Sequence, residues 1–201
     1  MKTRFKPREL TLLGLLTAIL LVMSYTPLGY LNIGPLAITL NMIPVAISAV
    51  ALGPFGGAVT GAVFGMTSFL QCLGIGGTSA MGVILFEINP LFAFIQRFVP
   101  RMLTGLLTGY IFQLARKLGA KKAAGYISGF AAAFFNTALF MTALVVLFGN
   151  TDYIQNLIGG RNVLVFICTF VGINAVVEML VSTFVTGILG YTLEKARLIG
   201  R

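Results

Sequence analysis

Six polar side chains capable of strong interactions lie within the apolar stretches that follow Phe86. They are Glu87, Arg97, Arg101, Asn136, Asn174 and Glu178, and Asn41 and Gln71 from the first half complete the candidate substrate-binding set. In a bilayer, charged groups are costly and usually serve function. Guanidinium and amide groups together suit a ligand that carries a carboxylate with hydroxyl or amide groups. The chemistry expected of this set is recognition of a small polar acid.

The spacing of these residues places them on shared helix faces. Arg97 and Arg101 are four residues apart, as are Asn174 and Glu178, so each pair lies on one face of a helix. Counted from the outer ends of their segments, Arg97 and Asn174 each lie 12 residues deep, which is about 18 Å of helix. Asn136 reaches a similar depth from the other direction. The sequence therefore predicts that these groups meet near mid-membrane.

The charged residues allow two arrangements. We expect Arg101 to form an ion pair with Glu178, because pairing neutralises both groups in low dielectric. Arg97 would then offer its guanidinium to a ligand. Alternatively, Arg97 snorkels outward or pairs with Glu178 itself. Glu87 is expected about 15 Å from Arg97 along the same helix.

Other chemistries find no support in the residues. Histidine, the commonest metal ligand and general base, is missing from the sequence. Cys72 and Cys168 are far apart and fall in apolar segments, where they are expected to be buried small side chains. The sequence contains no P-loop, HExxH or GxSxG motif. We expect no metal site, no cofactor, no catalytic residues and no enzymatic activity.

A long uncharged run indicates which elements position the polar residues. Of 201 residues, 58% are apolar and only 9% charged, whereas soluble domains use charge on about a quarter of their residues. No charged residue occurs in the 77 residues from Leu10 to Phe86. As helix, this run would be roughly 115 Å long, so it must cross a bilayer core of about 30 Å about three times. The segments lack the alternation of a barrel, so the sequence predicts an all-α membrane protein.

Proline and glycine breaks divide the chain into six predicted transmembrane helices within a single domain, residues 1–201. The predicted spans are about Leu10–Ser24, Ala37–Leu52, Phe55–Leu73, Val83–Ala115, Ala123–Phe148 and Asn162–Leu193. Gly53-Pro54 alone separates the second span from the third. The first, third and fifth connections between spans are longer. They are Tyr25–Leu36, Gly74–Gly82 and Gly149–Arg161. They are expected either to cover a cavity open to the outside or to be ordinary solvated connectors.

Lysine and arginine gather on one side of this topology. They precede the first span, join the fourth to the fifth, and follow the sixth: Lys2, Arg4, Lys6, Arg8, Arg116, Lys117, Lys121, Lys122, Lys195, Arg197 and Arg201. Cytoplasmic loops carry such an excess, so the N and C termini are both expected in the cytoplasm of a multi-pass bacterial plasma-membrane protein. This excess of lysine and arginine in cytoplasmic segments accounts for the net charge of +9. Nucleic acid binding is therefore not needed to explain the charge, and no nucleic acid partner is expected.

Small residues recur at four-residue spacing in three spans. These rows are Gly57, Gly61 and Gly65 in the third span, Gly105 and Gly109 in the fourth, and Gly14 with Ala18 in the first. Such rows allow helices to approach closely. We expect the rows in the third and fourth spans to pack against other helices of the chain. The row in the first span could instead face a partner subunit.

Three stretches carry a family resemblance. They are the basic start leading into Gly14-xxx-Ala18, the block IPVAISAVALGPFGGAVTGAVFG at 43–65, and FVPRMLTGLLTGYIF at 98–112. With its size, six spans and three outer loops, the chain resembles the substrate-binding membrane subunits (S components) of bacterial energy-coupling factor (ECF) vitamin transporters. The resemblance covers essentially the whole chain and implies an S-component-like bundle surrounded by membrane lipid.

The resemblance implies capture of a vitamin from outside, followed by association with a transmembrane coupling subunit and two ATPase subunits that use the ATP. In that family an AxxxA motif of the first helix docks on the coupling subunit, and Gly14-xxx-Ala18 matches it with glycine in the first position. TPLGY, IPVAI and FVPR look most like the pantothenate branch. This agrees with a carboxylate partner for Arg97. The alternative is the same role for riboflavin, folate or another B vitamin.

Three other classes of protein are alternatives. If the protein were a stand-alone secondary carrier or channel, the purified chain would transport its substrate without ATPase subunits. An intramembrane enzyme would show bound metal or turnover. A scaffold subunit would bind no ligand.

Overall fold

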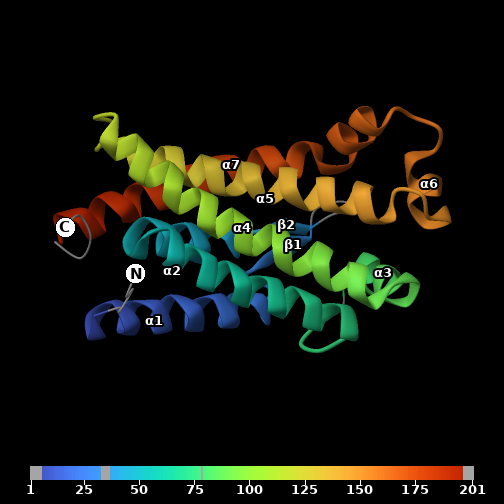
Figure 1. The fold of residues 1–201 in the computed structure, drawn as a ribbon, viewed down its shortest axis with the longest axis horizontal. Helices are drawn as coiled ribbons and strands as arrows, with labels where there is room; N and C mark the ends of the chain where they lie inside the picture. The colour runs from blue at the N-terminus through green and yellow to red at the C-terminus, as the bar shows by residue number, and fades with distance from the viewer. Residues whose placement is uncertain (1–5, 33–36, 78, 197–201) are drawn as a thin grey trace.

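The computed structural model describes residues 6–32, 37–77 and 79–196 and shows an elongated bundle of helices (Figure 1). Lys2, Arg4, Arg197 and Arg201, which contribute to the predicted orientation, lie outside the described residues. Apart from connections and one short pair of strands, the described chain is helical. The predicted α class is therefore confirmed.

The elements follow one another along the chain in a simple order. The helices are α1 (Pro7–Ser24), α2 (Met42–Leu70), the 3-10 helix η1 (Gln71–Leu73), α3 (Ala80–Ile88), α4 (Pro90–Lys117), α5 (Ala124–Phe148), α6 (Asp152–Ile158) and α7 (Val163–Lys195). Strands β1 (Tyr30–Asn32) and β2 (Ala37–Thr39) pair antiparallel, with Tyr30 opposite Thr39. Among the described residues, four segments are long and apolar enough to cross a membrane: Pro7–Ser24, Met42–Leu73, Ala124–Phe148 and Asn174–Lys195.

The chain reverses direction within α2, at Gly53. This residue has φ 77° and ψ −170°, a conformation that requires glycine and precedes Pro54. A Cβ placed on Gly57 would lie 2.7 Å from the Ala49 Cβ, although eight residues of continuous helix would separate them by about 12 Å. The two halves of α2 therefore pack against each other as a hairpin. The turn predicted at Gly53-Pro54 is confirmed.

The predicted fourth span is wrong in one respect, because the structure divides it into α3 and α4 at Asn89 and Pro90. The Asn89 side chain accepts a hydrogen bond from the Phe92 N–H (3.1 Å), and Pro90 occupies the first helical position. An asparagine cap followed by proline starts a helix well, because proline lacks only an N–H that would have no partner there. Glu87 and Arg97 consequently belong to different helices.

Three further boundaries differ from the prediction. The second predicted span begins with β2, since residues 37–39 pair with β1 before α2 starts at Met42. The sixth is interrupted at Gly172 (φ 20°, ψ −113°), so the depth of Asn174 cannot be counted along one straight helix. The connection after α5, predicted to lie outside, contains α6, which Thr151 caps and whose Ile154 is fully buried.

Helices α2 and α4 pack closely through the predicted glycine rows. The Arg101 carbonyl oxygen lies against Gly61, where a Cβ would stand, and a Cβ on Gly65 would lie 2.8 Å from the Phe98 Cα. Gly57 and Gly105 face each other in the same seam. Glycine lets the two backbones touch. The expectation that these rows pack within the chain is confirmed, and the contact fixes the height of Arg101 in the bundle.

We predict that Gly61→Ala destabilises the protein, because its Cβ would collide with the α4 backbone at Arg101. Overpacking of this kind costs about 1–3 kcal/mol, so the midpoint of thermal unfolding in detergent should fall by several degrees, at roughly 2–4 °C per kcal/mol. Gly14→Ala is the matched control, since nothing lies within 4 Å of its Cβ position. A midpoint for Gly61→Ala equal to that of the control would contradict the close contact.

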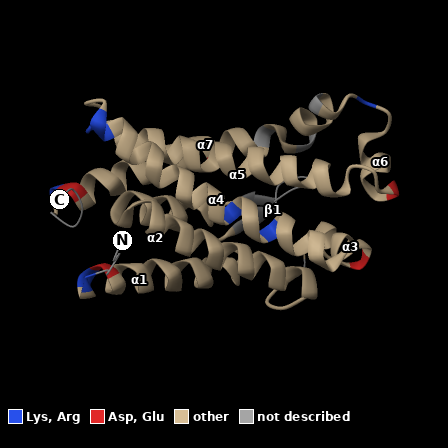
Figure 2. Ribbon diagram, viewed as in Figure 1, with Lys and Arg blue, Asp and Glu red and all other residues tan. Residues whose placement is uncertain are grey.

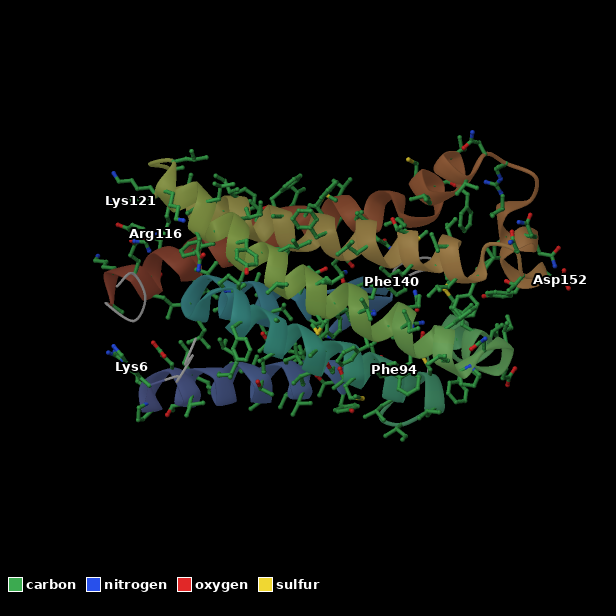
Figure 3. All side chains as sticks on the ribbon, viewed as in Figure 1. Lys6, Phe94, Arg116, Lys121, Phe140 and Asp152 are labelled. Atoms are coloured by element: carbon green, nitrogen blue, oxygen red, sulfur yellow. The ribbon has the colours of Figure 1, made fainter. Side chains whose placement is uncertain are left out.

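Most of the described cations gather at one end of the bundle. The start of α1, the end of α7 and the α4–α5 connection lie together there, with Lys6, Arg116 and Lys121 labelled (Figures 2 and 3). Arg116 of α4 forms an ion pair with Glu194 of α7 (3.3 Å). Asp152, in α6, lies at the opposite end. The bundle thus has a basic end and an end formed by α3 and α6.

Candidate substrate-binding site

A cavity of about 630 Å³ with many polar residues in its lining lies within the bundle. Its walls come from α2, α4, α5 and α7, from the end of α1, β2, η1 and the start of α3, and from the connections that follow α1 and η1. Its polar lining consists of Ser24, Tyr25, Thr26, Thr39, Ser68, Gln71, Ser79, Arg97, Arg101, Asn136, Thr137, Asn174 and Glu178. Of the three connections predicted to lie outside, the first two therefore contribute to the cavity lining among the described residues. A cavity of this size and polarity suits a small ligand with several polar groups.

Six of the eight candidate residues line this one cavity. They are Gln71, Arg97, Arg101, Asn136, Asn174 and Glu178. Four different elements supply them, since α4 carries both arginines, α7 carries Asn174 and Glu178, α5 carries Asn136, and η1 carries Gln71. The spacing of four residues on α4 and on α7 brings each pair to the cavity face of its helix, as predicted.

Arg97 is held by two serine hydroxyls. Its side chain is only 6% exposed. The guanidinium donates to Ser79 Oγ (3.1 Å) and to Ser68 Oγ (3.5 Å). Ser79 also caps α3 by accepting from the Gly82 N–H. These contacts come from α2 and from the start of α3, so both fix the direction in which Arg97 enters the cavity.

Arg101 lies one helical turn further along α4 and is held by different groups. Its Nη1 donates to the Arg97 carbonyl oxygen (2.8 Å), and its guanidinium lies over the ring of Phe64, 4.7 Å from the ring centre. The side chain is 5% exposed. Figure 2 shows basic residues in the middle of α4, well away from the basic end of the bundle. The cavity therefore contains two deeply buried cations.

The facing wall supplies acceptors and amides. Glu178 Oε1 accepts a hydrogen bond from the Thr39 backbone N–H, which ties α7 to β2. Asn174 lies one turn away on α7. Within the described residues, the Asn136 side-chain oxygen has no hydrogen-bond partner, although buried polar atoms normally have one. An ion pair between Arg101 and Glu178 stays a prediction, and both side chains line the same cavity.

Two of the eight candidates do not line the cavity. Glu87 is exposed on α3, because the break at Asn89 and Pro90 turns that part of the chain away from α4. Asn41 is fully buried just before α2, and a Cβ on Gly29 would lie 2.7 Å from its side-chain oxygen. Asn41 thus packs beneath the connection between α1 and β1, outside the cavity lining.

Gln71 lines the cavity and also joins two elements. Its side-chain amide donates to the Ser24 carbonyl oxygen (2.8 Å), so it connects η1 to the end of α1. Ser24 lines the cavity as well. Gln71 can therefore position the rim of the cavity in addition to any contact with a ligand.

The lining also includes residues outside the candidate set, among them Thr39, Ser68, Ser79 and Phe140. Thr39 contributes through its backbone, which side-chain patterns do not reveal. Ser79 could have been recognised, because a serine at the start of an apolar helix is a typical cap. Phe140 follows Asn136 by four residues, so the spacing that grouped the other candidates also places it on the same face of α5.

The small pair on α1 lies outside the cavity. Gly14 and Ala18 are both exposed, and no atom lies within 4 Å of the position that a Gly14 Cβ would occupy. Leu10, Leu15 and Val22 of the same helix are also exposed. The face of α1 that carries Gly14 and Ala18 is therefore apolar and exposed, with small side chains at these two positions.

The fold and cavity define a helical membrane protein with a buried polar chamber. A family model described as ECF transporter, substrate-specific component matches residues 8–190. The chain belongs to this family, which confirms the resemblance seen in the sequence at that level. It is accordingly a substrate-binding subunit of an ECF transporter, and the family is a transporter component rather than an enzyme family. A search of curated proteins gives no match.

Proposed function

We propose that this subunit binds pantothenate in the cavity that contains Arg97 and Arg101. The observation that carries the proposal is the convergence of two buried guanidinium groups with Asn136, Asn174 and Glu178 on one chamber. Guanidinium groups pair strongly with a carboxylate. Amide and carboxylate side chains on the facing wall suit the hydroxyl and amide groups of the same ligand. Pantothenate is a small acid with both kinds of group.

The candidate residues have distinct roles in this proposal. Arg97 and Arg101 bind the carboxylate. Asn136 and Asn174 bind the amide and hydroxyl groups. Glu178 accepts a hydrogen bond from a hydroxyl group of the ligand. Gln71 shapes the rim. TPLGY, IPVAI and FVPR, which resemble the pantothenate branch, favour the same substrate. Riboflavin, folate and other B vitamins are the alternatives, and the absence of tryptophan argues weakly against flat ring systems.

We propose that the chain crosses the plasma membrane of a bacterium six times, with both termini in the cytoplasm. The spans would be α1, the two halves of α2, α3 with α4, α5, and α7. The gathering of Lys6, Arg116 and Lys121 at one end supports this orientation, because cytoplasmic ends are rich in lysine and arginine. The connections that line the cavity then face outward, where the vitamin arrives.

Transport in this proposal requires partners. The exposed face of α1 at Gly14 and Ala18 contacts the transmembrane coupling subunit, and two ATPase subunits supply the energy from ATP. Small exposed residues allow a second helix to approach closely. The chain itself binds neither ATP nor metal in this scheme.

Calorimetric titration of the purified subunit with pantothenate, riboflavin and folate tests the substrate. We expect one pantothenate per chain, bound at least about a hundredfold more tightly than the other two, which corresponds to about 2.8 kcal/mol. Tighter binding of riboflavin or folate than of pantothenate would contradict pantothenate as the substrate and would favour that vitamin instead. Uptake by the subunit alone in liposomes, without the other subunits, would favour a stand-alone carrier.

A further inference from the structure

Phe140 of α5 lies against both buried arginines. The Arg97 guanidinium carbon is 5.3 Å from the centre of its ring, and the Arg101 guanidinium carbon is 5.0 Å from the same centre. Each distance is within the range of a cation–π interaction. Phe140 lines the cavity (Figure 3 labels its place in the middle of the bundle), and it lies one turn from Asn136 on α5. It is the ring that the two arginines share.

Two cations at neighbouring positions in a low-dielectric interior repel each other. A carboxylate placed between them would remove this repulsion, but it would also use the charge that a ligand needs. The negative face of an aromatic ring attracts both cations and leaves their net charge in place. Phe140 therefore reduces the cost of holding the two guanidinium groups together without itself neutralising either of them.

The remaining contacts show why the shared ring matters. Arg97 is otherwise held by Ser68 and Ser79, whereas Arg101 is held by the Arg97 carbonyl oxygen and by Phe64. These anchors belong to different elements and set each side chain separately. Among the contacts of the described residues, the Phe140 ring is one that touches both guanidinium groups and so relates them to each other. With spacing i, i+4 on α4, the two groups are close enough to receive the two oxygens of one carboxylate.

We infer that Phe140 is a positioning residue that holds Arg97 and Arg101 as a pair for a single ligand carboxylate. The inference rests on the proposed function for the identity of the ligand, but its structural part does not. It implies that the subunit distinguishes an acid from the corresponding neutral alcohol through Phe140, even though the ring itself carries no charge.

Titration of Phe140→Leu with pantothenate and with its neutral alcohol analogue tests the inference. We expect pantothenate affinity to fall at least about tenfold and alcohol affinity to change less than about threefold, since only the acid uses the arginine pair. Phe140→Tyr should restore pantothenate affinity, because tyrosine keeps the aromatic face. Phe134→Leu is the matched control, since Phe134 is an exposed residue of α5 that stacks on Phe130. Equal losses for acid and alcohol would overturn the inference.

A second measurement keeps the inference testable if the wild-type protein does not bind pantothenate, an outcome that contradicts the proposed function alone. The thermal midpoints of Phe140→Leu, Arg101→Met and the double variant form a cycle without any ligand. Coupling through the ring predicts that the midpoint change of the double variant differs from the sum of the single changes by at least about 2 °C. Additive changes would overturn the positioning role.

Discussion

Replacing Arg97 by alanine is expected to abolish pantothenate binding or weaken it by at least about a hundredfold. The guanidinium is 6% exposed, lines the cavity and is aimed by Ser68 and Ser79. Hydrogen bonds between charged groups contribute about 1.5–3 kcal/mol each. Removal of Arg97 would also leave one buried carboxylate oxygen without its partner, and an unsatisfied buried group costs more when it is charged. Calorimetric titration of the purified variant measures the loss directly.

Arg116→Ala is the matched control for this experiment. Arg116 lies on the same helix, but it is paired with Glu194 at the basic end of the bundle. Its removal should leave pantothenate affinity unchanged. The Arg97 variant should still copurify with the coupling subunit and ATPases, because the cavity and the α1 face are separate surfaces. Near-normal affinity of Arg97→Ala would remove the role assigned to this residue.

A bulky residue at Gly14 or Ala18 is expected to block uptake and spare binding. Gly14→Leu would place a bulky side chain on the exposed face of α1 at Gly14 and Ala18. The fold should tolerate it, because nothing lies within 4 Å of the position that a Gly14 Cβ would occupy. A partner helix that needs close approach could then no longer dock. We expect uptake of labelled pantothenate by cells that express the complete transporter to fall at least about tenfold, whereas affinity of the purified subunit should stay unchanged.

Leu180→Phe serves as the control for this surface. Leu180 is 54% exposed on α7, a different helix, so a larger side chain there leaves the exposed face of α1 at Gly14 and Ala18 unchanged. Its uptake should stay close to that of the wild type. Normal uptake by Gly14→Leu and Ala18→Leu would contradict the docking role of α1.

Much of the cavity could be predicted from the sequence because buried charges are rare in apolar helices. Arg97, Arg101 and Glu178 were conspicuous for that reason, and the i, i+4 rule placed Asn174 beside Glu178 on one face. Helix length then related residues on different segments by depth. These two simple rules predict the common location of five candidates, Arg97, Arg101, Asn136, Asn174 and Glu178, which line one chamber, although neither rule shows what a side chain contacts.

The errors have equally specific causes. The sequence predicts Glu87 on the same helix as Arg97 because the apolar composition continues on both sides of Asn89 and Pro90. In the structure the asparagine cap and the proline start a new helix there despite that composition. The interruption at Gly172 leaves little signal, since glycine also occurs within membrane helices. Phe140 is one of 17 phenylalanines, and only the folded chain shows which of them lies against both arginines.

Mass spectrometry of the small molecules that copurify with the wild-type subunit and with Arg97→Ala tests the central proposal most directly. We predict about one pantothenate per chain in the wild-type protein and none above background in the variant. Recovery of no small molecule from either protein would contradict a carboxylate-binding chamber centred on Arg97. The same conclusion would follow if both proteins yielded equal amounts of the same compound.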